Sequence, residues 1–103
     1  MPTNTINPKN FSPPEAFIEL GSLEVTDAAR KSLSEADIRN AIVSHSKSHF
    51  GFVSDETWQS NLSQLALRGR VRSTWVGASG IRFWILTHIH YNLTRVALES
   101  EYS

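Results

Sequence analysis

The chain of 103 residues contains no cysteine. This absence excludes disulfide scaffolds, thiolate zinc sites, iron–sulfur clusters and cysteine nucleophiles. No apolar run approaches the roughly 20 residues that span a bilayer, and the first residues lack the basic and apolar regions of a signal peptide. We therefore expect a soluble protein in a reducing, cytoplasmic setting, with no contact to a membrane.

Proline is present, but only at the start of the chain. All four prolines lie within residues 1–15, among turn-forming asparagines and serines. Such a segment cannot pack a core and is typical of a flexible arm. We expect residues 1–15 to form this N-terminal arm and residues 16–103 to form a single domain, which suits a chain of this length.

Three short signals predict helices in the first two-thirds of the domain. Thr26, Ser34 and Ser54 each precede acidic residues and then apolar residues at helical spacing. A hydroxyl side chain at the N-cap followed by acids in the first turn is the usual start of a helix. Gly69 is placed to end the third helix as its C′ residue.

The apolar period changes from 3.6 to 2 after residue 69. Residues 70–76, 81–87 and 93–98 are predicted strands joined by short turns, and residues 17–25 are expected to add a further strand. The sequence therefore predicts an α+β fold, in which two to three N-terminal helices pack on one face of an antiparallel sheet of three to four strands. Val71 should lie under the helices and Arg70 and Arg72 on the opposite face, because arginines are too costly to bury.

Charge is divided along the chain although the net charge is zero. Residues 1–56 contain eight acidic and five basic side chains, whereas residues 57–98 contain five arginines and no acid. Guanidinium groups bind phosphate and carboxylate in a bidentate manner, so the arginines are candidate ligands for an anion or for nucleic acid: Arg68, Arg70, Arg72, Arg82 and Arg95. The alternative is that they pair with acids of the first half of the domain.

The four histidines are candidate metal ligands. His45 and His49 have the spacing of one helix face, and His88 and His90 have the spacing of one strand face. If the two elements adjoin, the four imidazoles could hold zinc or nickel. The alternative is one buried or capping histidine, His45, and three surface histidines without a metal, so that the protein has no cofactor.

Catalytic arrangements are few. Serine and threonine side chains in the predicted strands could pair with a histidine as a nucleophile, but no nucleophile-elbow sequence is present. A small ribonuclease of the toxin type remains an alternative, because such enzymes also place helices before an antiparallel sheet. Arg70, Arg72 and His88 would then bind phosphate and transfer protons.

The order of residues along the chain resembles a family of small bacterial proteins that are often carried on plasmids and other mobile elements, labelled plasmid-related protein. The residues that match are Leu20-Gly21, His45, Gly51, Asn61, Gly69-Arg70, Ser73, Trp75, Gly80, Trp84-Ile85-Leu86-Thr87, Thr94 and Glu101-Tyr102. Some members carry the label type I restriction subunit M, but this chain has no room for the cofactor-binding domain of a methyltransferase. His49, His88 and His90 stand where the family has, or usually has, acidic residues.

The resemblance implies kinship of fold and no particular activity. We expect a non-enzymatic binding or accessory module that binds a partner protein or a second copy of itself, through a strand edge or a sheet face. Weak binding of nucleic-acid backbone through the arginines is the alternative, together with the ribonuclease activity considered above.

Overall fold

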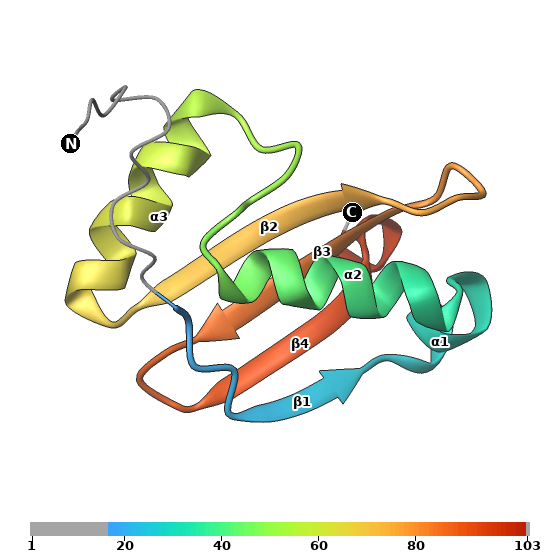
Figure 1. The fold of residues 1–103 in the computed structure, drawn as a ribbon, viewed down its shortest axis with the longest axis horizontal. Coiled ribbons are helices and arrows are strands. Elements are labelled where there is room, and N and C mark those ends of the chain that lie inside the picture. Colours follow the sequence, from blue (N-terminus) through green and yellow to red (C-terminus); the bar gives the residue numbers. More distant parts are fainter. Residues whose placement is uncertain (1–16, 103) are drawn as a thin grey trace, which may run out of the picture.

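The structure is a computed structural model that describes residues 17–102; the predicted arm of residues 1–15 lies outside the described residues. A four-stranded sheet with the order β1-β4-β3-β2 forms its centre (Figure 1). The strands are β1 (Ser22–Val25), β2 (Arg70–Val76), β3 (Arg82–His88) and β4 (Leu93–Leu98). The helices are α1 (Asp27–Ser32), α2 (Glu35–Ser46), α3 (Asp55–Leu67) and a final 3₁₀ turn, η1 (Glu99–Tyr102). The predicted α+β class is confirmed, with the helices ahead of most strands.

Each of the first three helices begins where the sequence predicts it. The side-chain oxygen of the N-cap residue accepts a hydrogen bond from the backbone N–H three residues later. The N-cap residues are Thr26, Ser34 and Ser54, with distances of 3.1, 3.0 and 3.1 Å. Within residues 17–102, no helix combines the length and apolar character that crossing a bilayer requires.

The sheet is mixed, which corrects the expectation of an antiparallel one. β2, β3 and β4 form the predicted antiparallel meander, but β1 pairs with β4 in parallel. The strand expected over residues 17–25 is also shorter, because Gly21 bends the chain with a φ of 65° just before β1. Three helices, α1, α2 and α3, separate β1 from β2 along the chain, and β1 lies at the edge of the sheet next to β4, opposite the β2 edge.

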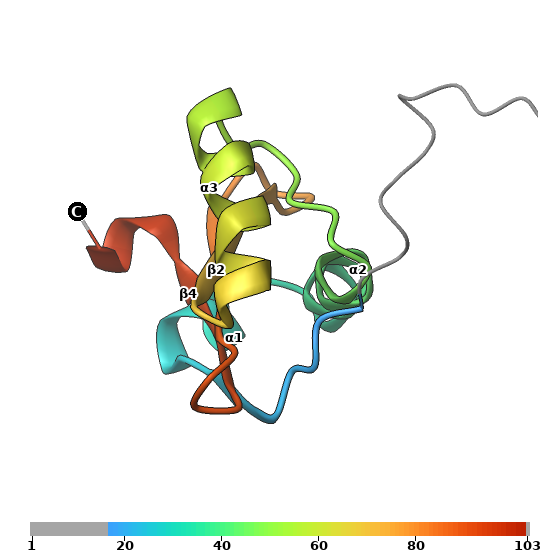
Figure 2. The same cartoon turned by 90° about the vertical axis from the view of Figure 1, so that its left-hand side faces the viewer.

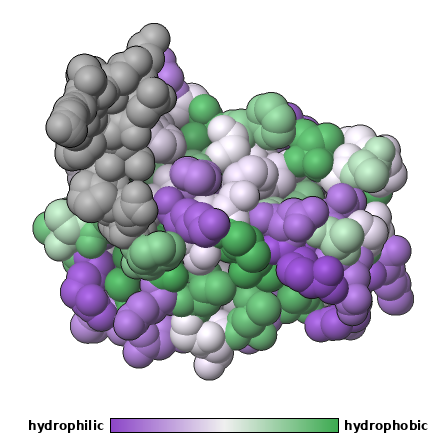
Figure 3. All heavy atoms as spheres, viewed as in Figure 1, coloured by the Kyte–Doolittle hydropathy of each residue, from purple (hydrophilic) through white to green (hydrophobic). Residues whose placement is uncertain are grey.

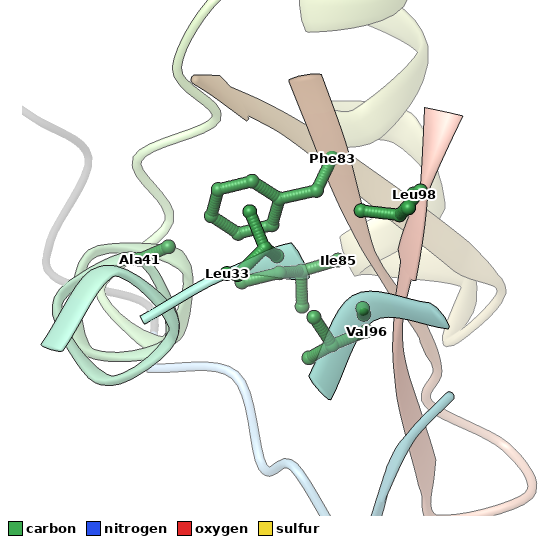
Figure 4. Packing of buried hydrophobic residues seen from close by; sticks show 7 residues of the cluster. Leu33, Ala41, Phe83, Ile85, Val96 and Leu98 are labelled. Carbon is green, nitrogen blue, oxygen red and sulfur yellow. The ribbon is translucent and has the colours of Figure 1, made fainter. Parts of the chain in front are cut away.

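One sheet face packs on α1 and α2 to form the main core. Phe83 and Ile85 from β3 and Val96 from β4 are buried against Leu33 and Ala41 (Figure 4). A second cluster of Ile18, Phe50, Val71 and Ile89 lies where α3 and the loop before it reach the sheet. The burial of Val71 with exposure of Arg70 confirms the predicted alternation of β2.

Helix α3 does not share the face that α2 covers. It lies beside β2, at the edge of the sheet, while α2 and η1 lie on opposite sides of the sheet (Figure 2). Helix α3 is attached to this edge by a polar contact. Asn61, the one buried residue of α3, is hydrogen-bonded to the β2 backbone and is not part of the apolar core. The expectation that two to three helices pack on one face is therefore met by α1 and α2, while α3 lies at the edge of the sheet.

Candidate functional site

A chain of buried polar groups joins α2 to the sheet. His45 is fully buried; its Nδ1 lies 2.6 Å from Ser73 Oγ and its Nε2 lies 2.8 Å from Thr87 Oγ1. The chain continues on one side to the indole N–H of Trp75, which donates to Ser73 at 2.6 Å. On the other side it runs through Thr94 Oγ1 to the backbone carbonyl of Leu20.

The Leu20 carbonyl at one end, together with an uncharged imidazole in the middle, fixes the direction of the hydrogen bonds in this chain. The Leu20 carbonyl can only accept, so Thr94 donates to it and must accept from Thr87. Thr87 has then used its proton and accepts from His45 Nε2–H, which leaves Nδ1 to accept from Ser73. His45 is therefore the neutral Nε2–H tautomer, and burial lowers its pKa from 6.5 to about 4.

This arrangement excludes Ser73 as a nucleophile for an external substrate. A hydroxyl donating to an imidazole is the pairing that activates a serine, but Ser73, His45 and Thr87 are all fully buried. No substrate atom can reach the oxygen without unfolding the core. The hydrogen bonds of His45 to Ser73 and Thr87 instead hold α2 against β2 and β3.

The four histidines do not come together, which corrects the hypothesis of a metal site. Both ring nitrogens of His45 are engaged inside the core, whereas His88 lies on the opposite sheet face, in register with Arg70. His49 follows the end of α2, and His90 lies in the turn between β3 and β4, where its ring contacts Tyr91. Within residues 17–102, no group of three or more potential ligands could hold a metal.

The five candidate arginines fall into two classes. Arg95 pairs with Glu24 at 3.8 Å, as the alternative of pairing with acids of the first half expects, whereas Arg82 pairs with Glu99 of η1 at 3.2 Å. The other three, Arg68, Arg70 and Arg72, have no carboxylate within salt-bridge distance among the described residues.

Arg68 does not continue the row of arginines along β2. It forms the C-cap of α3 in the left-handed conformation, with a φ of 57° and its N–H directed back to the helix carbonyls. Gly69 follows it as the predicted C′ residue, although the left-handed conformation is adopted by Arg68. Arg70 and Arg72 therefore remain as the pair of unneutralised arginines that share one face of the strand.

Two aromatic residues beside these arginines were not predicted as site residues. Trp84 lies in β3, paired with Thr74 of β2, on the sheet face opposite the buried Phe83 and Ile85. Tyr102 stacks on it from η1, with ring centroids 4.9 Å apart and planes at 17°. The alternation of side chains along β3 could have placed Trp84 on the same face as Arg70 and Arg72. No pattern in the sequence indicated the turn η1, which places Tyr102 on Trp84.

The β2 edge of the sheet is closed by side chains of α3. The amide of Asn61 accepts from the backbone N–H of Arg72 at 3.1 Å and donates to its carbonyl at 2.8 Å. Gln64 Oε1 accepts from the N–H of Arg70 at 3.3 Å. These side chains occupy the backbone groups that a neighbouring strand would use.

The loop before α3 closes the remaining part of the same edge. The N–H of Thr74 donates to the carbonyl of Phe50 at 3.0 Å, and the carbonyl of Thr74 accepts from Phe52 at 2.8 Å. The outward N–H groups of Arg70, Arg72 and Thr74 and the carbonyls of Arg72 and Thr74 thus have partners within the chain, so an added strand could not pair with them without displacing these contacts.

The β1 edge differs. Ser22 and Thr26 donate to carbonyls of the β4 side at 2.8 and 3.0 Å. Because bonding direction alternates along a strand, the backbone groups of Leu23 and Val25 point away from the sheet. No residue of the described part of the chain pairs with them.

Comparison of the chain with protein-family models, with curated proteins and with solved structures finds no match. The resemblance to the plasmid-related family stays a prediction.

Proposed function

We propose that this protein is a non-enzymatic binding module that receives an extended segment of a partner protein at its open β1 edge. The observation that carries the proposal is the contrast between the two edges of one sheet. Asn61 and its neighbours close the β2 edge, whereas the outward backbone groups of Leu23 and Val25 have no partner among residues 17–102. An unpaired strand edge is a template for an added strand.

Apolar surface next to this edge would be covered by such a strand. Apolar side chains gather between α2 and β1 on the face seen in Figure 3. Leu23 of β1 is itself 48% exposed. Backbone hydrogen bonds would give the affinity, and alternate apolar side chains of the partner would give specificity.

Charge favours a basic partner over a second copy of this chain. Glu19, Glu24 and Asp27 are exposed in and around β1, and Arg95 is the one base that pairs with them among the described residues. Two copies joined through β1 would bring these acids together, and like charges across a strand pair are destabilising. We propose that the protein and this partner are cytoplasmic, because a chain without cysteine does not rely on an oxidising compartment for disulfide bonds.

The test uses amide hydrogen exchange measured by NMR on the whole chain. A short synthetic peptide that alternates valine and lysine should slow exchange at Leu23 and Val25, and its valine–glutamate counterpart should not. Leu23→Pro removes an outward N–H without removing a bond to β4, so it should abolish the protection. Leu23→Ala is the matched control and should retain it.

The result that would overturn the proposal is equally specific. Neither peptide slowing exchange at these two amides, or equal protection in Leu23→Pro, would show that β1 does not accept a strand. Dimerisation through β1, seen as a mass increase that Leu23→Pro removes, would replace the partner protein with a second copy.

A further inference from the structure

The sheet face opposite α2 carries a hollow of about 350 Å³. Polar residues of the first half of α3, Ser60 among them, form one wall. Arg70 and Arg72 of β2 and Leu86 of β3 also line it, and Tyr102 from η1 stands beside them. It lies at the β2 side of the sheet, so it is separate from the β1 edge and independent of the function proposed above.

An aromatic stack forms part of this hollow. Tyr102 lies on the indole of Trp84, and the guanidinium carbon of Arg72 lies 4.2 Å from the centroid of the same ring. Tyr102 is 43% exposed, so its phenol ring is within reach of a ligand. Flat aromatic surfaces beside guanidinium groups are what proteins use to stack bases.

The nearby acids do not neutralise the arginines of the hollow. Glu99 is bonded to Arg82 and accepts from the indole N–H of Trp84 at 3.2 Å. Glu101 accepts from the backbone N–H of Leu98 and from the hydroxyl of Thr26, both at 2.7 Å. Both carboxylates of η1 are thus turned to other partners.

Arg72 is held in place by the indole and not by a carboxylate. Its Nε is buried and has no hydrogen-bond partner, so its position depends on the contact with Trp84. Arg70 lies on the same face two residues away, roughly 6.5–7 Å along the strand. This spacing is close to that of successive phosphates in an extended single strand.

We propose that this hollow binds a nucleotide unit of single-stranded nucleic acid. Phosphate oxygens accept hydrogen bonds from Arg70 and Arg72, and the base stacks on the exposed face of Tyr102. An acidic peptide would contact the arginines but not stack on the aromatic ring, whereas a nucleotide contacts both. Because the arginines contact the backbone, binding is tolerant of base sequence.

Fluorescence anisotropy with a labelled single-stranded oligonucleotide at low salt tests the proposal. Arg70→Ala/Arg72→Ala should weaken binding at least tenfold. Arg30→Ala/Arg39→Ala removes the same charge from α1 and α2, neither of which lines the hollow, and should weaken it no more than about threefold. With two phosphates contacted, log K should fall against log salt with a slope of about −1.4.

The aromatic contribution is tested by Tyr102→Ala, which should weaken binding severalfold. Tyr91→Ala, which removes an exposed tyrosine in the β3–β4 turn, is its control. A mononucleotide that competes as well as the oligonucleotide would assign the hollow to free nucleotides instead of a strand. Equal binding by wild type and Arg70→Ala/Arg72→Ala, no binding by wild type at low salt, or binding of an acidic peptide that matches the oligonucleotide would overturn the proposal.

Discussion

The side-chain amide of Asn61 makes with the backbone of Arg72 the two hydrogen bonds that a neighbouring β-strand would make. Its Oδ1 accepts from the N–H at 3.1 Å and its Nδ2 donates to the carbonyl at 2.8 Å. Asn61 is 3% exposed and is the one fully buried residue of α3. One side chain therefore both attaches α3 to the sheet and closes the sheet edge.

Asn61→Leu should lower the free energy of unfolding by about 2–6 kcal/mol, because it leaves two backbone groups without partners, at about 1–3 kcal/mol each. Urea denaturation measures the loss. Ser63→Leu adds the same side chain at an exposed position of the same helix and should change stability little. A variant at position 61 as stable as wild type would show that water replaces the amide at no cost.

The buried histidine predicts a specific pH dependence of stability. The pKa of His45 falls to about 4 in the folded protein from 6.5, so the unfolded chain binds a proton that the folded protein does not. The contribution of neutral His45 to the free energy of unfolding is therefore fully present above about pH 6.5. It is lost as the pH falls toward 4, by up to 1.4 kcal/mol per pH unit and by about 3 kcal/mol in all.

His45→Gln isolates this effect from the titration of carboxylates. Chemical denaturation at a series of pH values between 4 and 7 should give a steeper slope for wild type than for the variant. Parallel slopes for the two proteins would mean that His45 is protonated in the core, contrary to the direction of the hydrogen bonds through Ser73 and Thr87.

Gly21 should resist substitution more strongly than Gly80. A Cβ at Gly21 would collide with the backbone carbonyl of Asn92, in addition to the cost of a φ of 65°. Gly21→Ala should therefore destabilise the protein by about 2–4 kcal/mol and expose the amides of β1 to exchange. Gly80 also has a positive φ but no atom within 4 Å, so Gly80→Ala should cost only about 1–2 kcal/mol. Equal losses would remove the packing explanation.

The protein should not cleave RNA. Arg70, Arg72 and His88 do share a sheet face, as a toxin-type ribonuclease would need. Acid–base cleavage uses a second proton-transfer group, and the carboxylate of Glu24 on that face is engaged by Arg95. A fluorogenic RNA substrate should stay intact and expression should not arrest growth. Cleavage that His88→Ala abolishes would establish the enzyme.

Local signals in the sequence predicted the fold well where a single side chain decides the conformation. The hydroxyls of Thr26, Ser34 and Ser54 set the helix starts, and the alternation along β2 set the face of Val71. The parallel pairing of β1 was not predictable in this way, because pairing direction depends on where the intervening helices deliver the chain.

The candidate site was predictable only in part, for the same physical reason. The charge division identified Arg70 and Arg72, but which arginines would be neutralised depended on contacts between distant residues, such as Arg95 with Glu24. His45 had the spacing of a metal ligand, yet hydroxyls on two strands engage both of its nitrogens. Short-range sequence patterns show which residue types are present, whereas the chemistry of a site depends on which distant residues the fold places beside them.

The parallel pairing of β1 with β4 has a consequence for the kinetics of folding. The residues that meet there are about seventy positions apart, as in the pairing of Ser22 with Leu93, so closing that loop costs more entropy than closing the short turns between β2, β3 and β4. The meander can form first and present β4 as a vacant edge. Attachment of β1 is then the late step, and the strand that forms last is the first expected to detach under mild denaturation.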